Sequence, residues 1–121
     1  MKRVHRCVAE NRADGDKRVR IAILDSGIDA THKEIAGNIA FDVSPSSSEQ
    51  QKRPRITAWK GFLSELDPLR DRVGHGTHCA SVILRTAPYT SLYIARIFDD
   101  DQEISDCDQV VEVRSACRTV L

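Results

Sequence analysis

The chain has 121 residues, and its 18 Lys and Arg balance 18 Asp and Glu, so the formal net charge is zero. This length suits one domain, or a piece of one, and is short for the larger α/β folds. The balanced charge gives no strong positive field for a phosphate backbone or an anionic membrane, and aromatic residues, at 5%, are too few for a base-stacking surface. We therefore expect a globular protein that binds neither nucleic acid nor membranes.

Targeting signals and disulfides are not evident in the sequence. No segment approaches the roughly 18 apolar residues of a membrane span, and the first twenty residues lack a secretory apolar stretch, which favours an intracellular location without assigning one. The four cysteines form no CxxC pair and are too few for a disulfide-built fold. We expect them to be reduced thiols.

The beginning of the chain predicts a basic arm followed by a buried strand. Residues 1–18 contain six Lys and Arg and no sustained apolar period, which indicates a flexible arm ahead of a folded region over 19–121. Residues 19–24, VRIAIL, predict a strand covered on both faces in a parallel sheet. Gly27 can adopt a positive φ, so the chain can turn sharply past the strand's carboxyl end, where open α/β sheets bind ligands.

The remaining elements alternate between loops, helices and a second strand. Residues 44–55 are polar and predict an exposed loop, and residues 56–62 form a second apolar patch around Trp59. The segment HGTHCASVILR predicts a helix from His75 that ends at Ala87 and Pro88, and residues 92–98 predict a buried strand that Asp99, Asp100 and Asp101 terminate with charge. This alternation indicates an α/β protein.

A final helix-like segment follows Ile104. Its apolar residues recur at helical intervals, although Val113 and Arg114 interrupt the stripe. The residues of the stripe are Cys107, Val110, Val111, Cys117 and Leu121.

Two candidate catalytic residues, Asp25 and His75, lie 50 positions apart at a predicted strand end and a predicted helix start. A buried carboxylate that accepts the Nδ1 proton of an imidazole fixes its tautomer and leaves Nε2 free to take a proton from a nucleophile. We therefore expect the two side chains within hydrogen-bond reach, about 2.6–3.2 Å. Gly74 and Gly76 flank the histidine, so a substrate backbone could approach the ring closely. Taken singly, each residue also has an ordinary structural explanation, as a capping aspartate or a half-exposed histidine.

The words IAILDSGID and GHGTHCASVI resemble the aspartate and histidine motifs of the subtilisin-like serine proteases, the subtilase or peptidase S8 family. The likeness extends through DATHKEIAGNI, where His32 matches a structural histidine of the family, to TAPYTSLYIARIF, and covers roughly residues 19–98. It implies the amino-terminal part of a catalytic domain, with a partial subtilisin-like doubly wound parallel sheet and flanking helices. It also implies peptide or protein substrates, Asp25 as the orienting acid, His75 as the general base, and no catalytic role for His78.

The sequence departs from the family pattern after the histidine motif. The family's nucleophilic serine lies in a GTSMA-like elbow and its oxyanion hole uses an asparagine, both downstream of the histidine. Here none of the ten serines has a glycine on both sides, and the only asparagines, Asn11 and Asn38, precede His75. We therefore interpret the chain as an endopeptidase fragment that is inactive by itself. Truncation, a gene-model error, a degenerate copy and an interaction module remain open.

Other chemistries fit the sequence less well. Ser81 lies six residues beyond His75 on the predicted helix and points elsewhere, and Cys79 fits a small buried packing residue better than a thiol nucleophile. His75, His78 and Cys79 have no second ligand cluster, so neither a metal nor another cofactor is expected. The word LDSG also matches aspartic proteases, but that interpretation needs a homodimer pairing two copies of Asp25 and leaves GHGTHCA unexplained.

Overall fold

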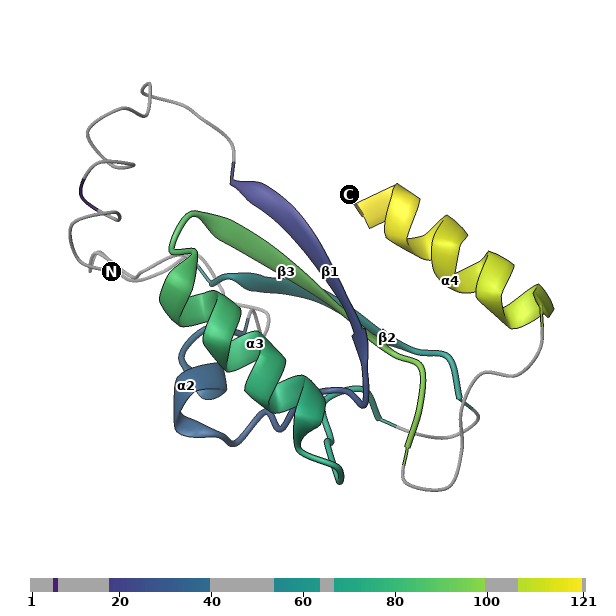
Figure 1. Ribbon diagram of the computed structural model, residues 1–121, viewed down its shortest axis with the longest axis horizontal. Helices are drawn as coiled ribbons and strands as arrows, with labels where there is room; N and C mark the ends of the chain where they lie inside the picture. The colour runs from purple at the N-terminus through teal and green to yellow at the C-terminus, as the bar shows by residue number, and fades with distance from the viewer. Residues whose placement is uncertain (1–5, 7–17, 40–53, 64–66, 100–106, 121) are drawn as a thin grey trace, which may run out of the picture.

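A computed structural model of the chain describes residues 6, 18–39, 54–63, 67–99 and 107–120. Most of the predicted basic arm (residues 1–5 and 7–17) and most of the predicted exposed loop (through residue 53) lie outside the described residues. The described part contains strands β1 (Val19–Asp25), β2 (Ile56–Gly61) and β3 (Thr90–Arg96), and helices α2 (Lys33–Ala36), α3 (His75–Thr86) and α4 (Cys107–Val120) (Figure 1).

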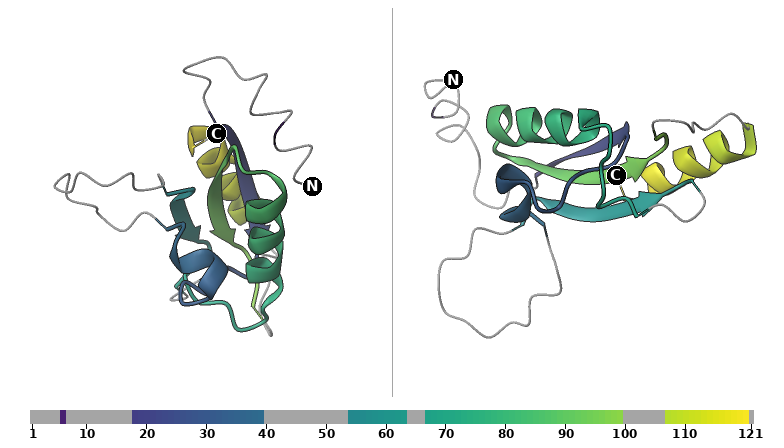
Figure 2. Two further views of the ribbon diagram at one scale, coloured as in Figure 1. Left: turned by 90° about the vertical axis from the view of Figure 1, so that its left-hand side faces the viewer. Right: turned by 90° about the horizontal axis from the view of Figure 1, so that it is seen from below.

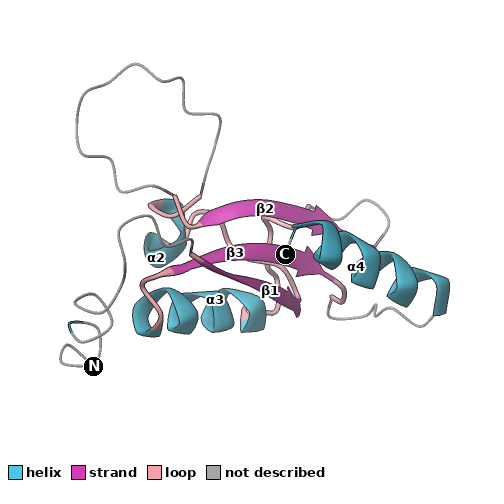
Figure 3. Ribbon diagram, turned by 90° about the horizontal axis from the view of Figure 1, so that it is seen from above, coloured by secondary structure: helices cyan, strands magenta, loops and turns pink. Residues whose placement is uncertain are grey.

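The three described strands form one parallel sheet in the order β1-β3-β2, with the last strand in sequence at the centre (Figure 3). β1 pairs with β3 along its whole length, from Val19 opposite Thr90 to Asp25 opposite Arg96. The predicted α/β class, with a partial doubly wound parallel sheet and flanking helices, is confirmed. The strand predicted over 92–98 begins and ends two residues earlier.

Side chains of the central strand alternate between two cores, one on each face of the sheet. Figure 2 shows helices on both faces. Leu92 and Ile94 belong to the larger core with Ile35 of α2 and Leu84 of α3. Tyr93, Ala95 and Phe62 belong to a smaller core with Val113 of α4. Helices therefore cover both faces of β3, which explains why its sequence is apolar throughout.

Arg55 corrects the prediction that residues 44–55 form an exposed loop. It is only 5% exposed, and its guanidinium donates to the carbonyls of Leu84 (2.7 Å), Thr90 (3.1 Å) and Ala87. The Leu84 and Ala87 carbonyls lie at the end of α3, where no helical amide remains to bond them, and the Thr90 carbonyl lies at the start of β3. The guanidinium thus supplies hydrogen-bond donors to these carbonyls, and burial lowers its pKa.

Asp99 also departs from expectation, because it is buried instead of ending β3 as a solvated charge. Its carboxylate forms an ion pair with Arg96 at 2.9 Å, and both side chains are almost fully enclosed. Arg96 additionally donates to the carbonyls of Asp67 (2.9 Å) and Arg70 (2.8 Å), so it fastens the loop before α3 to the central strand. The two buried charges compensate each other, and Nη1 of Arg96 donates to the two backbone carbonyls.

In α4 the buried position is Val113, whereas Val110 and Val111 are 56% and 65% exposed. The predicted stripe is therefore only partly right: its member Cys117 packs against the core, but Val110 and Val111 are exposed and Val113, which interrupts the stripe, packs on the sheet with Ala116. No helix in the described part of the chain is long and apolar enough to cross a membrane.

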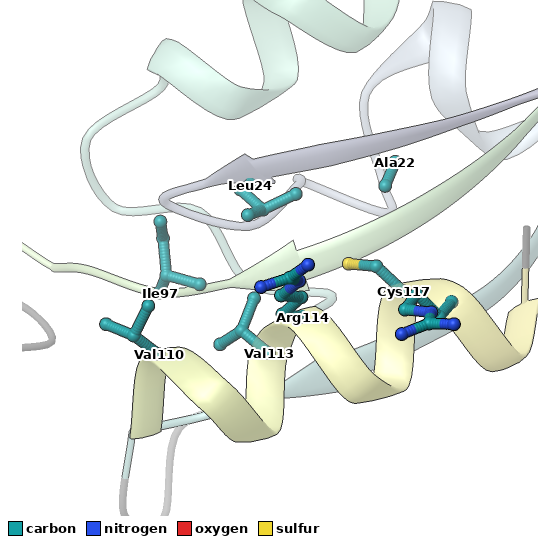
Figure 4. Close-up of a pocket in the computed structure, with 8 residues that line it drawn as sticks. Ala22, Leu24, Ile97, Val110, Val113, Arg114 and Cys117 are labelled. Atoms are coloured by element: carbon teal, nitrogen blue, oxygen red, sulfur yellow. The ribbon is translucent and has the colours of Figure 1, made fainter. Parts of the chain in front are cut away.

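An apolar groove of about 680 Å³ runs between β1 and α4 (Figure 4). Ala22 and Leu24 form one wall and Val110 and Val113 the other, while Ile97 closes one end. β1 is an edge strand of the described sheet, and Leu24 is 44% exposed. The isolated chain therefore leaves apolar surface in contact with water.

We expect the 121-residue chain to bind a hydrophobic dye such as ANS in this groove and to self-associate. Val110→Asp places a charge in the groove wall. It should lower dye fluorescence by the part that comes from dye bound in the groove. Val82→Asp, which changes another exposed helical valine outside the groove (43% against 56% exposed), is the matched control. A monodisperse monomer without dye binding would show that the groove is closed in solution.

Candidate active site

Asp25 and His75 meet where the carboxyl end of β1 reaches the first turn of α3 (Figure 1). Asp25 is the last residue of β1 and His75 is the first of α3. Because α3 runs back along the sheet before β3 begins, its amino terminus lies at the carboxyl ends of the strands, where α/β folds place their sites.

The expected hydrogen bond between the two side chains is present. His75 Nδ1 lies 2.8 Å from Asp25 Oδ2 and 2.9 Å from Oδ1. The aspartate side chain is 10% exposed, whereas the histidine side chain is 61% exposed. An imidazole that donates Nδ1–H to this carboxylate presents its Nε2 lone pair away from the pair.

Helix α3 begins without a side-chain cap of its own, because Gly74 occupies the capping position. Its first amides are bonded by two residues outside the helix instead: Gly76 N donates to Ser26 Oγ (3.1 Å) and Thr77 N donates to Asp71 Oδ2 (2.8 Å). These are two of the amides that every helix start leaves without an internal partner. The start of α3 is therefore fastened to the residue that follows Asp25.

Ser26 links the two carboxylates of this region. Its amide donates to Asp25 Oδ1 (2.8 Å), and its hydroxyl lies 2.8 Å from Asp71 Oδ1 and 3.2 Å from Asp25 Oδ1. A hydroxyl has one proton, and the shorter distance assigns it to Asp71. Burial opposes ionisation of Asp71, but hydrogen bonds from Thr77, Gly74 and Ser26 outweigh it and lower the pKa of this carboxyl.

Gly76 has a different role from the one expected from the sequence, which was to admit a substrate backbone. It is buried, and a Cβ there would lie 2.0 Å from Gly27 O and 3.2 Å from Asp25 Cβ. Gly27 itself has the predicted positive φ, 97°. The missing side chain at Gly76 therefore allows α3 to approach the end of β1.

Gly76→Ala should destabilise the fold although alanine is the better helix former. Helix propensity favours the change by about 1 kcal/mol, but the clash with Gly27 O requires α3 to move, and overpacking of this kind costs about 1–3 kcal/mol. Urea unfolding followed by Trp59 fluorescence measures the net effect. Gly37→Ala, where a Cβ meets nothing within 4 Å, is the control and should be neutral within about 0.5 kcal/mol.

Asp71→Asn should lower the unfolding free energy by about 1.5–3 kcal/mol at pH 7, because an amide nitrogen cannot accept from Thr77. The folded-state pKa of Asp71 is below its ordinary value of 3.8, so its contribution is complete above that value and disappears as pH falls through the folded-state pKa. The difference between wild type and variant should begin to shrink below about pH 3.8 in urea titrations and vanish below the folded-state pKa. Asp67→Asn, an exposed carboxylate in the same loop, should show a smaller difference.

Cys79 lies beside the pair, one turn along α3. Its Sγ is 3.8 Å from His75 Nδ1 and 3.9 Å from Nε2, and the residue packs at the margin of the larger core. Burial and the negative charge of Asp25 raise the pKa of this thiol, which keeps it protonated and argues against a nucleophilic role. The packing role was predicted, whereas the contact with the pair was not.

The other candidates from the sequence lie apart from the pair. Ser81 is buried and His78 is exposed, and both line a pocket beside Asp29 and His32. His32 precedes α2 and accepts a long hydrogen bond from Glu34 N at 3.4 Å, which suits the structural role implied for it.

Sequence reasoning missed Ser26 and Asp71 as site residues. An aspartate shortly before a predicted helix is a known capping signal, so Asp71 could have been identified. Nothing local indicates Ser26 as the second cap, since its partners Asp71 and Gly76 are 45 and 50 residues away.

A parallel α/β sheet with an aspartate–histidine pair at its carboxyl edge is an arrangement that serine hydrolases use. The model of the Subtilase family matches residues 16–116, and the chain belongs to this family. It is also 31% identical over 115 residues to the subtilisin-like protease het-Q2 of Podospora anserina, an alignment covering 77% of this chain and 31% of that protein. The chain thus spans about a third of this relative's length.

Proposed function

We propose that this chain supplies the acid and the general base of a subtilisin-type serine endopeptidase, with the nucleophilic serine contributed by sequence outside these 121 residues. The observation that carries the proposal is the 2.8 Å contact between Asp25 Oδ2 and His75 Nδ1 at the carboxyl edge of the sheet. Membership of the Subtilase family supports peptide or protein substrates. The same reasoning makes residues 19–121 part of a catalytic domain and residues 1–18 an arm that precedes it.

In this mechanism Nε2 of His75 removes the proton from the serine hydroxyl as its oxygen attacks the peptide carbonyl. Asp25 holds the imidazole by Nδ1–H and stabilises the imidazolium that forms. His75 then protonates the departing amine, which breaks the peptide bond and leaves an acyl-enzyme that water hydrolyses. The exposure of the imidazole, 61%, gives a nucleophile and a substrate access to it.

The proposal makes a paired prediction for the chain alone and for a chimera. Alone, the chain should show no peptidase turnover and no labelling by a fluorophosphonate, because removing the nucleophile of subtilisin lowers kcat by about 10⁶. Fused in place of the matching segment of the Podospora anserina relative, it should give a protein that a fluorophosphonate labels and that hydrolyses peptides.

Variants of the chimera test the individual roles. His75→Ala should lower kcat by about 10⁶ and Asp25→Asn by about 10⁴, as the corresponding losses in subtilisin-type triads indicate. His78→Ala, an exposed histidine on the same helix, should retain activity. A folded chimera without turnover would favour a degenerate copy, and labelling of the isolated chain that depends on His75 would show that one of its own serines is the nucleophile.

A further inference from the structure

Three side chains of different chemistry converge at the end of β1. Three possible metal-ligand atoms lie within 4.8 Å of one another: one carboxylate oxygen of Asp25, one ring nitrogen of His75 and Sγ of Cys79. Among the described residues, this is the group of His, Cys, Asp and Glu side chains close enough to share a metal ion. His78, which the sequence placed beside Cys79 as a possible ligand, does not belong to it. Asp25 belongs to the group instead, because the fold brings the end of β1 beside His75, 50 residues away in sequence.

Two features of the backbone hold these groups in place. His75 and Cys79 are four residues apart on α3, so their side chains share one face of the helix, one above the other. The carboxylate of Asp25 is held by a hydrogen bond from the backbone amide of Ser26. Two possible ligands on one face of α3, His75 and Cys79, therefore face the carboxylate of Asp25 at the end of β1.

The distances approach those of a tetrahedral zinc site. Bonds of about 2.0 Å to nitrogen and oxygen and about 2.3 Å to sulfur imply ligand-to-ligand separations of about 3.3–3.6 Å. The observed separations are 3.8 Å from Cys79 Sγ to His75 Nδ1 and 2.8 Å from that nitrogen to Asp25 Oδ2. Because all three ligand atoms lie within 4.8 Å of one another, turning the exposed imidazole and the Cys79 side chain about their side-chain bonds would bring them to these separations.

We propose that Asp25, His75 and Cys79 form a binding site for Zn²⁺, with water as the fourth ligand. The ion takes the place of the Asp25–His75 hydrogen bond: Nδ1 gives its lone pair to zinc while the neutral ring carries its proton on Nε2. The thiol loses its proton to solvent and binds as thiolate. The exposed side of the imidazole leaves the fourth position open to water, as in zinc sites with three protein ligands.

The donor set favours zinc over the abundant hard cations. Ca²⁺ and Mg²⁺ prefer six or more oxygen ligands, and here one carboxylate is combined with sulfur and nitrogen. On the proposed function, an ion bound at Nδ1 also breaks the contact by which Asp25 orients the general base, so zinc would inhibit the completed enzyme. The zinc site itself rests on geometry alone and does not require that function.

Direct metal binding tests the site without any activity measurement. The untagged, reduced 121-residue chain is titrated with Zn²⁺ against a fluorescent chelator and, separately, with Co²⁺ followed by absorption. We expect one tight equivalent and the thiolate-to-cobalt charge-transfer band of a four-coordinate site. Because the cobalt spectrum is recorded on the unaltered chain, it does not depend on whether a variant folds.

Variants assign the ligands. Cys79→Ser should weaken zinc binding by more than about 100-fold and remove the cobalt band, and Asp25→Asn should weaken binding by at least about 10-fold, since losing even an outer-shell partner costs about 10–100-fold. Cys117→Ser changes the half-buried thiol of α4 and should leave both signals unchanged. Retained zinc affinity in Cys79→Ser or Asp25→Asn, or a cobalt complex without the thiolate band, would overturn the three-ligand site. Far-UV circular dichroism confirms that each variant is folded.

Discussion

The site depends on how the first turn of α3 is attached to the end of β1. The helix supplies no capping side chain and has no acidic residue in its own first turn. Ser26, 50 residues away in sequence, and Asp71, in the loop just before the helix, bond its second and third amides, at Gly76 and Thr77. Helix starts are stabilised by such acceptors and by nearby negative charge. The stability of the helix start and the position of His75 therefore have the same cause.

This attachment brings two carboxylates close together, and the structure compensates their mutual repulsion. Asp25 and Asp71 both bond Ser26, and both lie at the positive end of the α3 dipole. The loop that carries Asp71 is fastened to β3 by Arg96, which donates to two of its carbonyls. Ion pairing, capping and the aspartate–histidine contact thus form one connected hydrogen-bond network, so a change in one part should alter the others.

Local sequence patterns predicted the elements but only part of this network. The apolar run before Asp25 and the helical spacing after His75 are complete within their own segments, so β1 and α3 were identified with nearly correct bounds. Arg55 was assigned to solvent because charge normally indicates exposure, yet its partners are backbone carbonyls that no side-chain pattern reveals. Val113 was assigned to the wrong face of α4 because the sheet that selects the face comes from other parts of the chain.

Asp25 lies on a strand that is paired on only one side in the described part of the chain. β1 is the edge strand, so one side of the proposed catalytic acid is held by strand pairing and the other is not. On the paired side Ile97 N donates to the Asp25 carbonyl (2.9 Å). Just after the strand, the amide of Ser26 donates to the Asp25 carboxylate. The carboxylate is therefore positioned by β3, by Ser26 and by the packing of Gly76, none of which requires a further strand. The Asp25–His75 geometry can thus form from these segments, even while the groove beside Leu24 stays open.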